Sequence, residues 1–277
     1  PTTMEELLRI SGLSHGTDVW LGNAQELIAN GTAKLSECVC CRDDIMNYLI
    51  DKGVAPKMAF TTMESVRKGR GLKPEMEQAM IEQHVPQWFM DSCKKIKYMF
   101  PKAHAAAYVM MAWRIAYCKV FYPLAYYAAY FSIRATGFSY ELMCQGKDRL
   151  ENYMKDYKKR KDTLSNKEQD VFKDMRIVQE MYARGFDFMP LDIYRAHPNR
   201  FQIIDGKLMP AINSIDGLGD NAAIYISEAA KDGPFLSKDD FRERTHVSRT
   251  AVDLMSDLGL LGSLPESNQL SLFDFGA

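Results

Sequence analysis

The chain has 277 residues, of which 47% are apolar and 26% are charged, and its net charge is −1. This composition is typical of a two-domain globular protein and excludes a strongly basic chain, so any nucleic-acid binding must come from local patches. No apolar run approaches the ~20 residues that span a bilayer, and the spacing of the six cysteines predicts reduced thiols in a cytoplasmic protein without a membrane segment.

The first part of the chain predicts helices separated by glycines. Met4–Ile10 predicts a short amphipathic helix, and glycines interrupt the pattern over residues 11–23. Asp43–Lys52 predicts a helix that is closed by Gly53. The chain opens without a signal-peptide pattern, and we expect it to be a piece of a longer protein.

The middle of the chain predicts longer helices. Ala103–Ala135 is rich in alanine and tyrosine, is apolar nearly all round and is interrupted by Pro123, which predicts a buried helix pair. Gln145–Lys161 is highly charged and predicts a solvated helix or connector. Asn166–Arg184 restores the helical period and ends at Gly185.

The composition changes after residue 185. Two short β-like pieces, Arg200–Ile204 and Lys207–Met209, flank Asp205-Gly206, which favours a hairpin turn. Two short helices with glycine-rich turns follow over 217–230 and 250–258. The predicted fold is therefore mainly α, with one small β-hairpin.

One long segment lacks acidic residues. An uncompensated positive field of this kind predicts a polyanionic partner, either a triphosphate or a DNA backbone. The alternative is an ordinary helix surface from which lysines extend into water. No Asp or Glu occurs between Asp91 and Glu141, whereas the same stretch contains Lys94, Lys95, Lys97, Lys102, His104, Arg114, Lys119 and Arg134.

Arg67, Lys68 and Arg70 form a second basic cluster, interspersed with Gly69 and Gly71. Glycines let a backbone approach a ligand closely, so the cluster suits phosphate contacts. The alternative, which this pattern favours, is an exposed helix C-terminus whose cations offset the helix dipole.

Two patterns argue against metal chemistry in this chain. Cys38, Cys40 and Cys41 have C-x-C-C spacing and are followed by no second Cys or His pair, so we expect structural thiols and no metal site. The chain has no Asp-x-Asp pair, and the adjacent acids Asp43 and Asp44 indicate a helix start. We therefore predict no catalytic residue and no cofactor within the chain.

Gly217-Leu218-Gly219 separates an apolar stretch from a helix that Asp220 is expected to cap. This pattern is typical of a helix-hairpin-helix motif, in which glycines permit a tight turn and expose N–H groups to a DNA phosphate without reading its sequence. A weaker second copy is predicted over 250–262. The alternative is a generic capping loop.

Near the C-terminus, a polar stretch precedes Gln269-Leu270-Ser271-Leu272-Phe273. Apolar residues at a polar chain end need a partner. The segment therefore predicts a flexible tail whose leucines and phenylalanine enter apolar pockets while Gln269 fixes the register. The alternative is that the tail packs on its own domain.

Ser11–Ala24, Cys41–Ile45 and Phe100–Tyr108 closely resemble segments of the PolC-type replicative DNA polymerases, which are bacterial DNA polymerase III alpha subunits. The resemblance extends through the whole chain and includes residues 269–273, which are similar to the peptide that docks into the bacterial sliding clamp. It implies polymerase fingers over 1–147, a helical connector with a β-hairpin over 148–210, a tandem helix-hairpin-helix domain that binds duplex DNA over 211–265, and a clamp-binding tail over 266–277.

The resemblance also implies roles for individual residues. Arg42, Lys102 and His104 are expected to contact the triphosphate of an incoming dNTP, and Ser11, His15 and Phe100 to line the rest of that pocket. The residues expected to bind primer-template DNA are Gly217, Leu218, Gly219, Asp220, Arg67, Lys68 and Arg70, the last three at the template backbone or the triphosphate, and those expected to bind the clamp are Gln269, Leu270, Leu272 and Phe273.

In this family the metal-binding aspartates and their Mg²⁺ lie upstream, in the palm, as does the proofreading exonuclease. This chain is therefore expected to position nucleotide and DNA at the replication fork, beside other replisome subunits, and to supply no metal ligand. The alternative is a non-enzymatic DNA-binding adaptor that is recruited to the sliding clamp. Nucleotide binding discriminates between the two, because an adaptor should show none.

Overall fold

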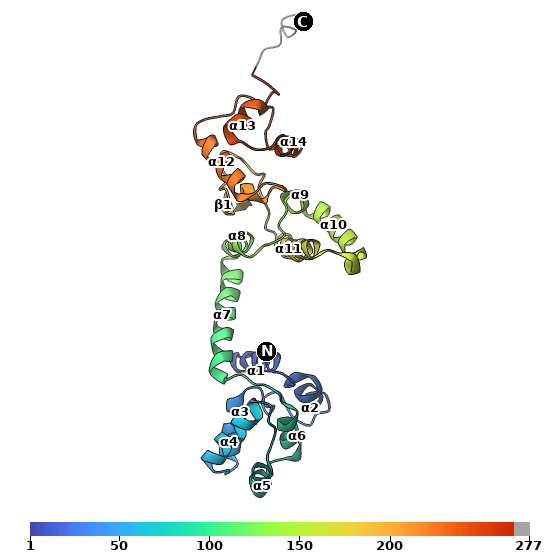
Figure 1. Ribbon diagram of the computed structural model, residues 1–277, viewed down its shortest axis with the longest axis vertical. Helices are drawn as coiled ribbons and strands as arrows, with labels where there is room; N and C mark the ends of the chain where they lie inside the picture. Colours follow the sequence, from blue (N-terminus) through green and yellow to red (C-terminus); the bar gives the residue numbers. More distant parts are fainter. Residues whose placement is uncertain (269–277) are drawn as a thin grey trace, which may run out of the picture. The chain divides into compact units, whose positions relative to one another are not determined.

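The structure is a computed structural model that describes residues 1–268, and the chain divides into two compact units, Pro1–Ala116 and Tyr117–Ala277. Figure 1 shows that both units are built mainly of helices, which confirms the predicted fold class. The first unit ends before residue 147, where the sequence places the end of the first domain; the predicted domain limits remain a prediction.

The first unit consists of helices joined by turns. Prolines at the first helical position begin α4 and α5, because their fixed φ suits a helix and their missing N–H costs nothing there. Its elements are α1 (Met4–His15), the distorted turn η1 (Trp20–Ala24), α2 (Gln25–Ala29), α3 (Arg42–Asp51), α4 (Pro56–Arg67), α5 (Pro74–Glu82), α6 (Gln87–Lys95) and most of α7 (Lys102–Phe121).

Glycines shape two of these helices in different ways. The predicted helix over 43–52 is confirmed as α3, and Gly53 follows it with φ +96°. α1 continues through Gly12 to His15, beyond its predicted end at Ile10. A Cβ at position 12 would lie 2.5 Å from the carbonyl oxygen of Cys40, so this glycine permits close packing and does not break the helix.

The second unit contains the remaining helices and one hairpin. Asp205 (φ +50°) and Gly206 (φ +74°) make the predicted turn, and Ile203 pairs with Leu208 in the antiparallel register. Its elements are α8 (Pro123–Ile133), α9 (Tyr140–Met143), α10 (Lys147–Lys159), η2 (Lys161–Thr163), α11 (Asn166–Ala183), β1 (Gln202–Ile204), β2 (Lys207–Met209), η3 (Ile212–Ser214), α12 (Asp220–Lys231), α13 (Lys238–Thr245) and α14 (Arg249–Asp257).

Apolar side chains build separate cores in the two units. In the first unit the core includes Ile45 and Phe89, and the Tyr48 ring stacks on Phe89 with centroids 4.2 Å apart. In the second unit one cluster lies around Tyr127 and the facing helices α10 and α11. Another joins α12, α13 and α14, with Phe241 fully buried, and it includes Ile215 and Leu218 from the turn before α12.

The break at Pro123 is confirmed, but the prediction of a buried helix pair is wrong for α7. In α8, Tyr127 is fully buried, whereas among the described residues α7 buries only Ala105 and Val109 and leaves Trp113 55% exposed. A helix that is apolar on all sides can be buried, but its sequence does not show which element buries it. Although α7 has 20 residues, neither it nor any other helix within residues 1–268 combines the length and apolar character needed to cross a membrane.

Candidate functional site

In the first unit, aromatic rings gather at the end of α1 and the start of α7. The Phe100 ring stacks on His104 with centroids 4.5 Å apart, and His104 lies 4.5 Å from Tyr108. Tyr98 meets Phe100 edge-on at 5.0 Å, and His15 lies 6.4 Å from Phe100. We call these five residues the aromatic strip. Tyr98 and Tyr108 are 41% and 57% exposed, so the strip offers aromatic surface to a planar base.

Backbone pairing explains why distant segments meet at the strip. The Thr17 N–H donates to the Tyr98 carbonyl at 2.9 Å, and the Lys97 N–H donates to the Thr17 carbonyl at 3.1 Å. Gly16 permits this approach, because a Cβ there would lie 2.9 Å from the Tyr98 oxygen. At the end of α1, the His15 Nδ1 lies 2.8 Å from the Ser11 carbonyl oxygen, which fixes the imidazole ring in its place within the strip. The structure thus brings the predicted residues Ser11 and His15 to one place.

A cation cluster lies beside the strip. The Arg42 N–H donates to the Phe100 carbonyl at 3.1 Å, so α3 begins directly against the strip. Glu64 of α4 is shared by three cations: its carboxylate lies 2.5 Å from Arg67 Nε, 3.0 Å from Lys68 Nζ and 3.6 Å from Arg42 Nη1. The hydrogen bonds from Arg67 and then Lys68 lower the pKa of Glu64 to about 2. We call Arg42, Arg67 and Lys68 the cation cluster.

Arg42 retains unused capacity for a ligand. Its Nε is buried and has no hydrogen-bond partner within residues 1–268, and its nearest acids, Asp43 and Glu64, lie at 3.9 and 3.6 Å. A buried donor without a partner is uncommon and disfavoured. The Arg42 side chain as a whole is about one-third exposed, so it can pair with an incoming anion.

Lys102, which the family resemblance places at the triphosphate, begins α7, and the protein itself caps this helix start. The Lys102 N–H donates to Asp43 Oδ2 at 2.6 Å, so this carboxylate caps the helix. The Lys102 side chain lines a cavity of about 300 Å³ together with Arg9 and Asp44. The Asp43 carboxylate therefore lies between the Lys102 N–H, which it accepts, and Arg42 Nε, which is 3.9 Å away. Within the described residues, the Lys102 side chain forms no ion pair.

The acid-free segment is partly neutralised by acids from elsewhere in the sequence, which corrects the expectation of an uncompensated field. Sequence distance hides these partners, because α-helical packing brings them in from other elements. The pairs are Lys94 with Glu77 (2.9 Å), Lys95 with Glu26 (3.5 Å) and Lys119 with Glu180 (2.8 Å).

Residues 67–71 have the geometry of the alternative given by the sequence, an exposed helix C-terminus with cations at its end. Arg67 is the last residue of α4 and Lys68 its cap, where cations offset the helix dipole. Gly69 has φ +69°, and a Cβ there would lie 2.4 Å from the Lys97 carbonyl oxygen. This glycine therefore serves internal packing, not approach to a ligand as the sequence suggests. Arg70 forms no ion pair in the part of the chain that the structure describes.

The three clustered cysteines are structural. All are buried, and burial raises the pKa of Cys40 and Cys41 to about 12, so both stay protonated. Asp44 Oδ2 accepts the N–H groups of Cys40 and Cys41, each at 3.0 Å, which confirms the helix-start interpretation of this acid. Within residues 1–268 there is no group of three or more His, Cys, Asp or Glu residues that could hold a metal ion.

In the second unit, residues 215–220 form a tight hairpin before α12. Gly217 has φ +81°, which glycine adopts without strain, and the Leu218 N–H donates to the Ile215 carbonyl at 3.1 Å. Leu218 is buried, whereas a Cβ at Gly217 or Gly219 would meet no atom within 4 Å, so the glycines lie on the open side.

The cap of α12 differs from the prediction. Gly219 is the N-cap and Asp220 is the first helical residue. Asp220 Oδ1 instead accepts from Asn213 Nδ2 at 2.8 Å, which holds the carboxylate away from the cap position. Because Gly219 has no side chain, no side-chain cap covers the first N–H groups of α12, and these groups suit a phosphate.

A second pair of helices follows α12, and the helix predicted over 250–258 is present as α14, the second of the pair. α13 and α14 are joined at His246 (φ +55°), and Ser248 Oγ accepts the Ala251 N–H at 3.2 Å to begin α14. The predicted turn at Gly259–Gly262 follows this pair. Sequence analysis missed α13 because the helix is almost entirely charged and buries little beyond Phe241.

The predicted clamp-binding residues lie outside the described part of the chain, which ends at residue 268. Just before it, the Asp239 N–H donates to the Glu266 carbonyl at 3.1 Å, and Lys238 Nζ lies 2.5 Å from Glu266 Oε1. Residue 266 is therefore held against the start of α13 by a hydrogen bond and an ion pair.

Sequence reasoning missed Glu64 and the exposed tyrosines of the aromatic strip, Tyr98 and Tyr108. A signal for Glu64 was present, because Glu64, Arg67 and Lys68 have the i, i+3 and i, i+4 spacing of ion pairs on one helix face. Tyr98 and Tyr108 carry no comparable signal, since their exposure depends on how residues 97–101 pair with the end of α1.

Two family models match the chain. One is described as the bacterial DNA polymerase III alpha subunit finger domain and matches residues 1–87. The other is the helix-hairpin-helix motif and matches residues 185–270. The first covers Ser11, His15, Arg42 and the cation cluster, and the second covers both helical hairpins.

Curated relatives match nearly the whole chain. DNA polymerase III PolC-type of Streptococcus sanguinis is 54% identical over 282 residues, that of Streptococcus mutans 55% over 283, and that of Bacillus subtilis 53% over 273. Each match covers 99% of this chain and 19% of the relative, so the chain spans about a fifth of the length of these proteins. Over nearly its whole length, the chain is therefore similar to a segment of the PolC-type DNA polymerase III proteins.

Proposed function

We propose that the first unit receives the incoming dNTP of a replicative DNA polymerase and that the second unit binds the primer-template duplex. One observation carries the nucleotide part: the aromatic strip and the cation cluster adjoin, linked by the hydrogen bond from the Arg42 N–H to the Phe100 carbonyl at 3.1 Å. A nucleotide needs both surfaces, one for its base and one for its phosphates.

The two surfaces divide the nucleotide by its chemistry. The rings of Phe100, His104 and Tyr108 offer stacking to the base or sugar side. Arg42 and Arg67 offer planar forks that match phosphate oxygens, and Lys68 adds a compact charge. Glu64 holds these cations until the triphosphate arrives, and Lys102 contributes to the field from beyond Asp43.

Nucleotidyl transfer belongs to the whole polymerase. In the family, Mg²⁺ bound by the palm supplies the metal chemistry, and this segment positions the nucleotide and the duplex for it. The hairpins at 215–220 and 245–249 bind the phosphate backbone without reading bases. Residues 269–273 dock into the sliding clamp and keep the enzyme at the replication fork with the other replisome subunits.

The competing function is a DNA-binding adaptor that is recruited to the clamp and binds no nucleotide. Calorimetric titration of the 277-residue chain with a dNTP, with and without primer-template, separates the two functions. We expect nucleotide binding that Arg42→Ala weakens and that Lys94→Ala leaves unchanged, because Lys94 pairs with Glu77 outside the cluster. Duplex binding without any nucleotide binding would favour the adaptor.

A further inference from the structure

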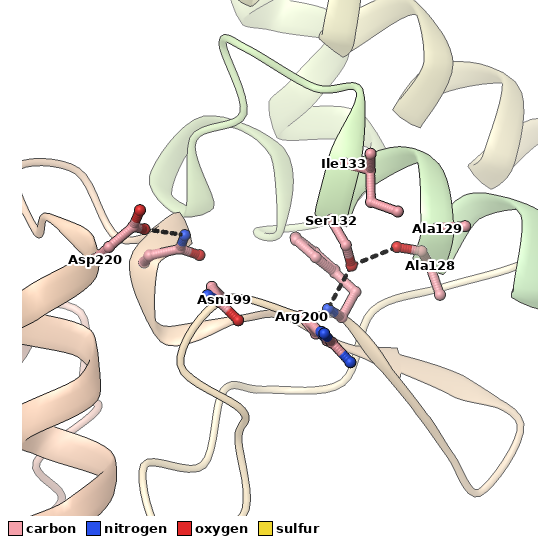
Figure 2. A pocket seen from close by; sticks show the side chains of 9 residues that line it. Ala128, Ala129, Ser132, Ile133, Asn199, Arg200 and Asp220 are labelled. Atoms are coloured by element: carbon pink, nitrogen blue, oxygen red, sulfur yellow. Dashed lines mark hydrogen bonds between the residues drawn. The ribbon is translucent and has the colours of Figure 1, made fainter.

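A groove lined by both polar and apolar residues lies beside the hairpin of residues 215–220, entirely within the second unit. Its cavity volume is about 640 Å³. Figure 2 shows Asn199 and Arg200 along one side, Ser132 and the small side chains of α8 along another, and Asp220 at the start of α12. We call this cavity the Arg200 groove. Asp220 lines this groove and is also the residue after Gly219. The groove is therefore continuous with the surface that carries the two hairpin glycines.

Hydrogen bonds hold the loop that carries Arg200 on both sides. The Phe201 N–H donates to Ser132 Oγ of α8 at 2.8 Å. From the other side, the Asn213 N–H donates to the Pro198 carbonyl at 2.9 Å. Because Asn213 lies in η3, which leads directly into the hairpin, Arg200 has a fixed place relative to the hairpin. Because the loop backbone is already positioned, binding needs to order only the Arg200 side chain.

The charge of Arg200 is unused in the free protein. Arg200 is exposed, and within residues 1–268 it forms no ion pair and donates no hydrogen bond. The acid in the groove, Asp220, accepts the amide of Asn213 at 2.8 Å. On the same loop, burial and then the charges of Arg200 and Lys231 lower the pKa of His197, as expected for a group in a positive field.

We propose that the Arg200 groove receives a phosphate of the duplex backbone next to the phosphate held by the hairpin, with Arg200 as its charged donor. The ligand class is a phosphodiester of double-stranded nucleic acid. Arg200 suits it because a guanidinium donates two parallel hydrogen bonds to phosphate oxygens. The inference rests on the proposed duplex binding by the second unit and extends its footprint beyond the hairpin.

The test is the salt dependence of duplex binding by the 277-residue chain. Each phosphate contact contributes about −0.9 to the slope of log K against log salt. We expect Arg200→Ala to make the slope shallower by about that amount and to weaken binding roughly tenfold at low salt. Arg200→Lys should keep most of the slope. The loss should be equal for unrelated duplex sequences, since phosphate contacts carry no sequence information.

Arg195→Ala is the matched control, because Arg195 is also exposed and lies outside the groove. Gly217→Val tests the hairpin separately. If Gly217→Val weakens binding while Arg200→Ala keeps the wild-type slope, the groove is no phosphate site and the hairpin proposal stands. If both variants are folded and bind like wild type, duplex binding by this unit is itself wrong. A loss at Arg200 that depends on base sequence would also overturn the inference.

Discussion

Glu64→Gln removes the carboxylate that the cation cluster shares and keeps the size of the side chain. In the free protein this carboxylate contacts Arg67 Nε at 2.5 Å, Lys68 Nζ at 3.0 Å and Arg42 Nη1 at 3.6 Å. A triphosphate bound by the same cations must share them with Glu64, and the two anions repel each other. We therefore expect Glu64→Gln to tighten dNTP binding.

Coulomb's law gives the size of the effect. Two unit charges 4 Å apart interact by about 1 kcal/mol in water and about 4 kcal/mol at an effective dielectric constant of 20. The Glu64 side chain is 22% exposed and three cations screen it, so the lower part of this range applies. A loss of ~1–2 kcal/mol of repulsion lowers Kd by about five- to thirtyfold.

The assay is an equilibrium titration of wild type and Glu64→Gln with one dNTP at low and high ionic strength. The gain should shrink as salt rises, because salt screens exposed charges. Glu77→Gln is the control, since Glu77 pairs with Lys94 at 2.9 Å away from the cluster. Thermal unfolding of both variants checks that the first unit stays folded.

Two results would refute this reasoning. A folded Glu64→Gln variant that binds nucleotide tenfold more weakly would show that Glu64 organises the cations and does not compete with the ligand. Unchanged binding would show that the cations around Glu64 do not receive the triphosphate. In either case Arg42 and the aromatic strip would need a different ligand arrangement.

Three further outcomes are expected. Leu272→Ala combined with Phe273→Ala should abolish binding to the sliding clamp in a pull-down, and wild-type affinity in the double variant would disprove docking by the tail. Ion pairing lowers the pKa of Glu64 from 4.5 to about 2. The Glu64 carboxylate therefore contributes its full stabilisation above about pH 4.5 and loses it as the pH falls through 2. The difference in unfolding free energy between wild type and Glu64→Gln should disappear over that interval. A thiol reagent at pH 8 should label Cys118, which is exposed, long before Cys40, whose pKa is raised to about 12 by burial; equal native-state rates, read by mass spectrometry, would contradict the buried thiol.

Local sequence patterns predicted the elements whose backbone conformation depends on one or two neighbouring residues. Asp205-Gly206 specifies the β-hairpin because both positions need positive φ, and Gly53 closes α3 for the same reason. Gly12 shows the limit of such reasoning. A glycine inside a helical pattern indicates either a break or a close approach, and only the position of Cys40 decides between them.

The site was less predictable than the fold because it depends on contacts between distant segments. Charge density pointed to the Lys94–Arg134 segment, yet Glu77 and Glu26 neutralise its first lysines from other helices. Family resemblance placed Lys102 at the triphosphate, but the structure shows that Asp43 already accepts the amide at the start of its helix. Arg42 was placed beside His104 by family resemblance alone, and the structure supplies the reason, since both residues contact Phe100.

The central claim is that the first unit positions the incoming nucleotide through Arg42. Single-turnover incorporation of one nucleotide by a polymerase that carries this segment tests it most directly, with Arg42→Ala compared with wild type. Loss of one charge-assisted phosphate contact, worth roughly 1.5–3 kcal/mol, should lower incorporation efficiency by about one to two decades while the affinity for primer-template stays the same. Wild-type incorporation by a folded Arg42→Ala enzyme would contradict the account.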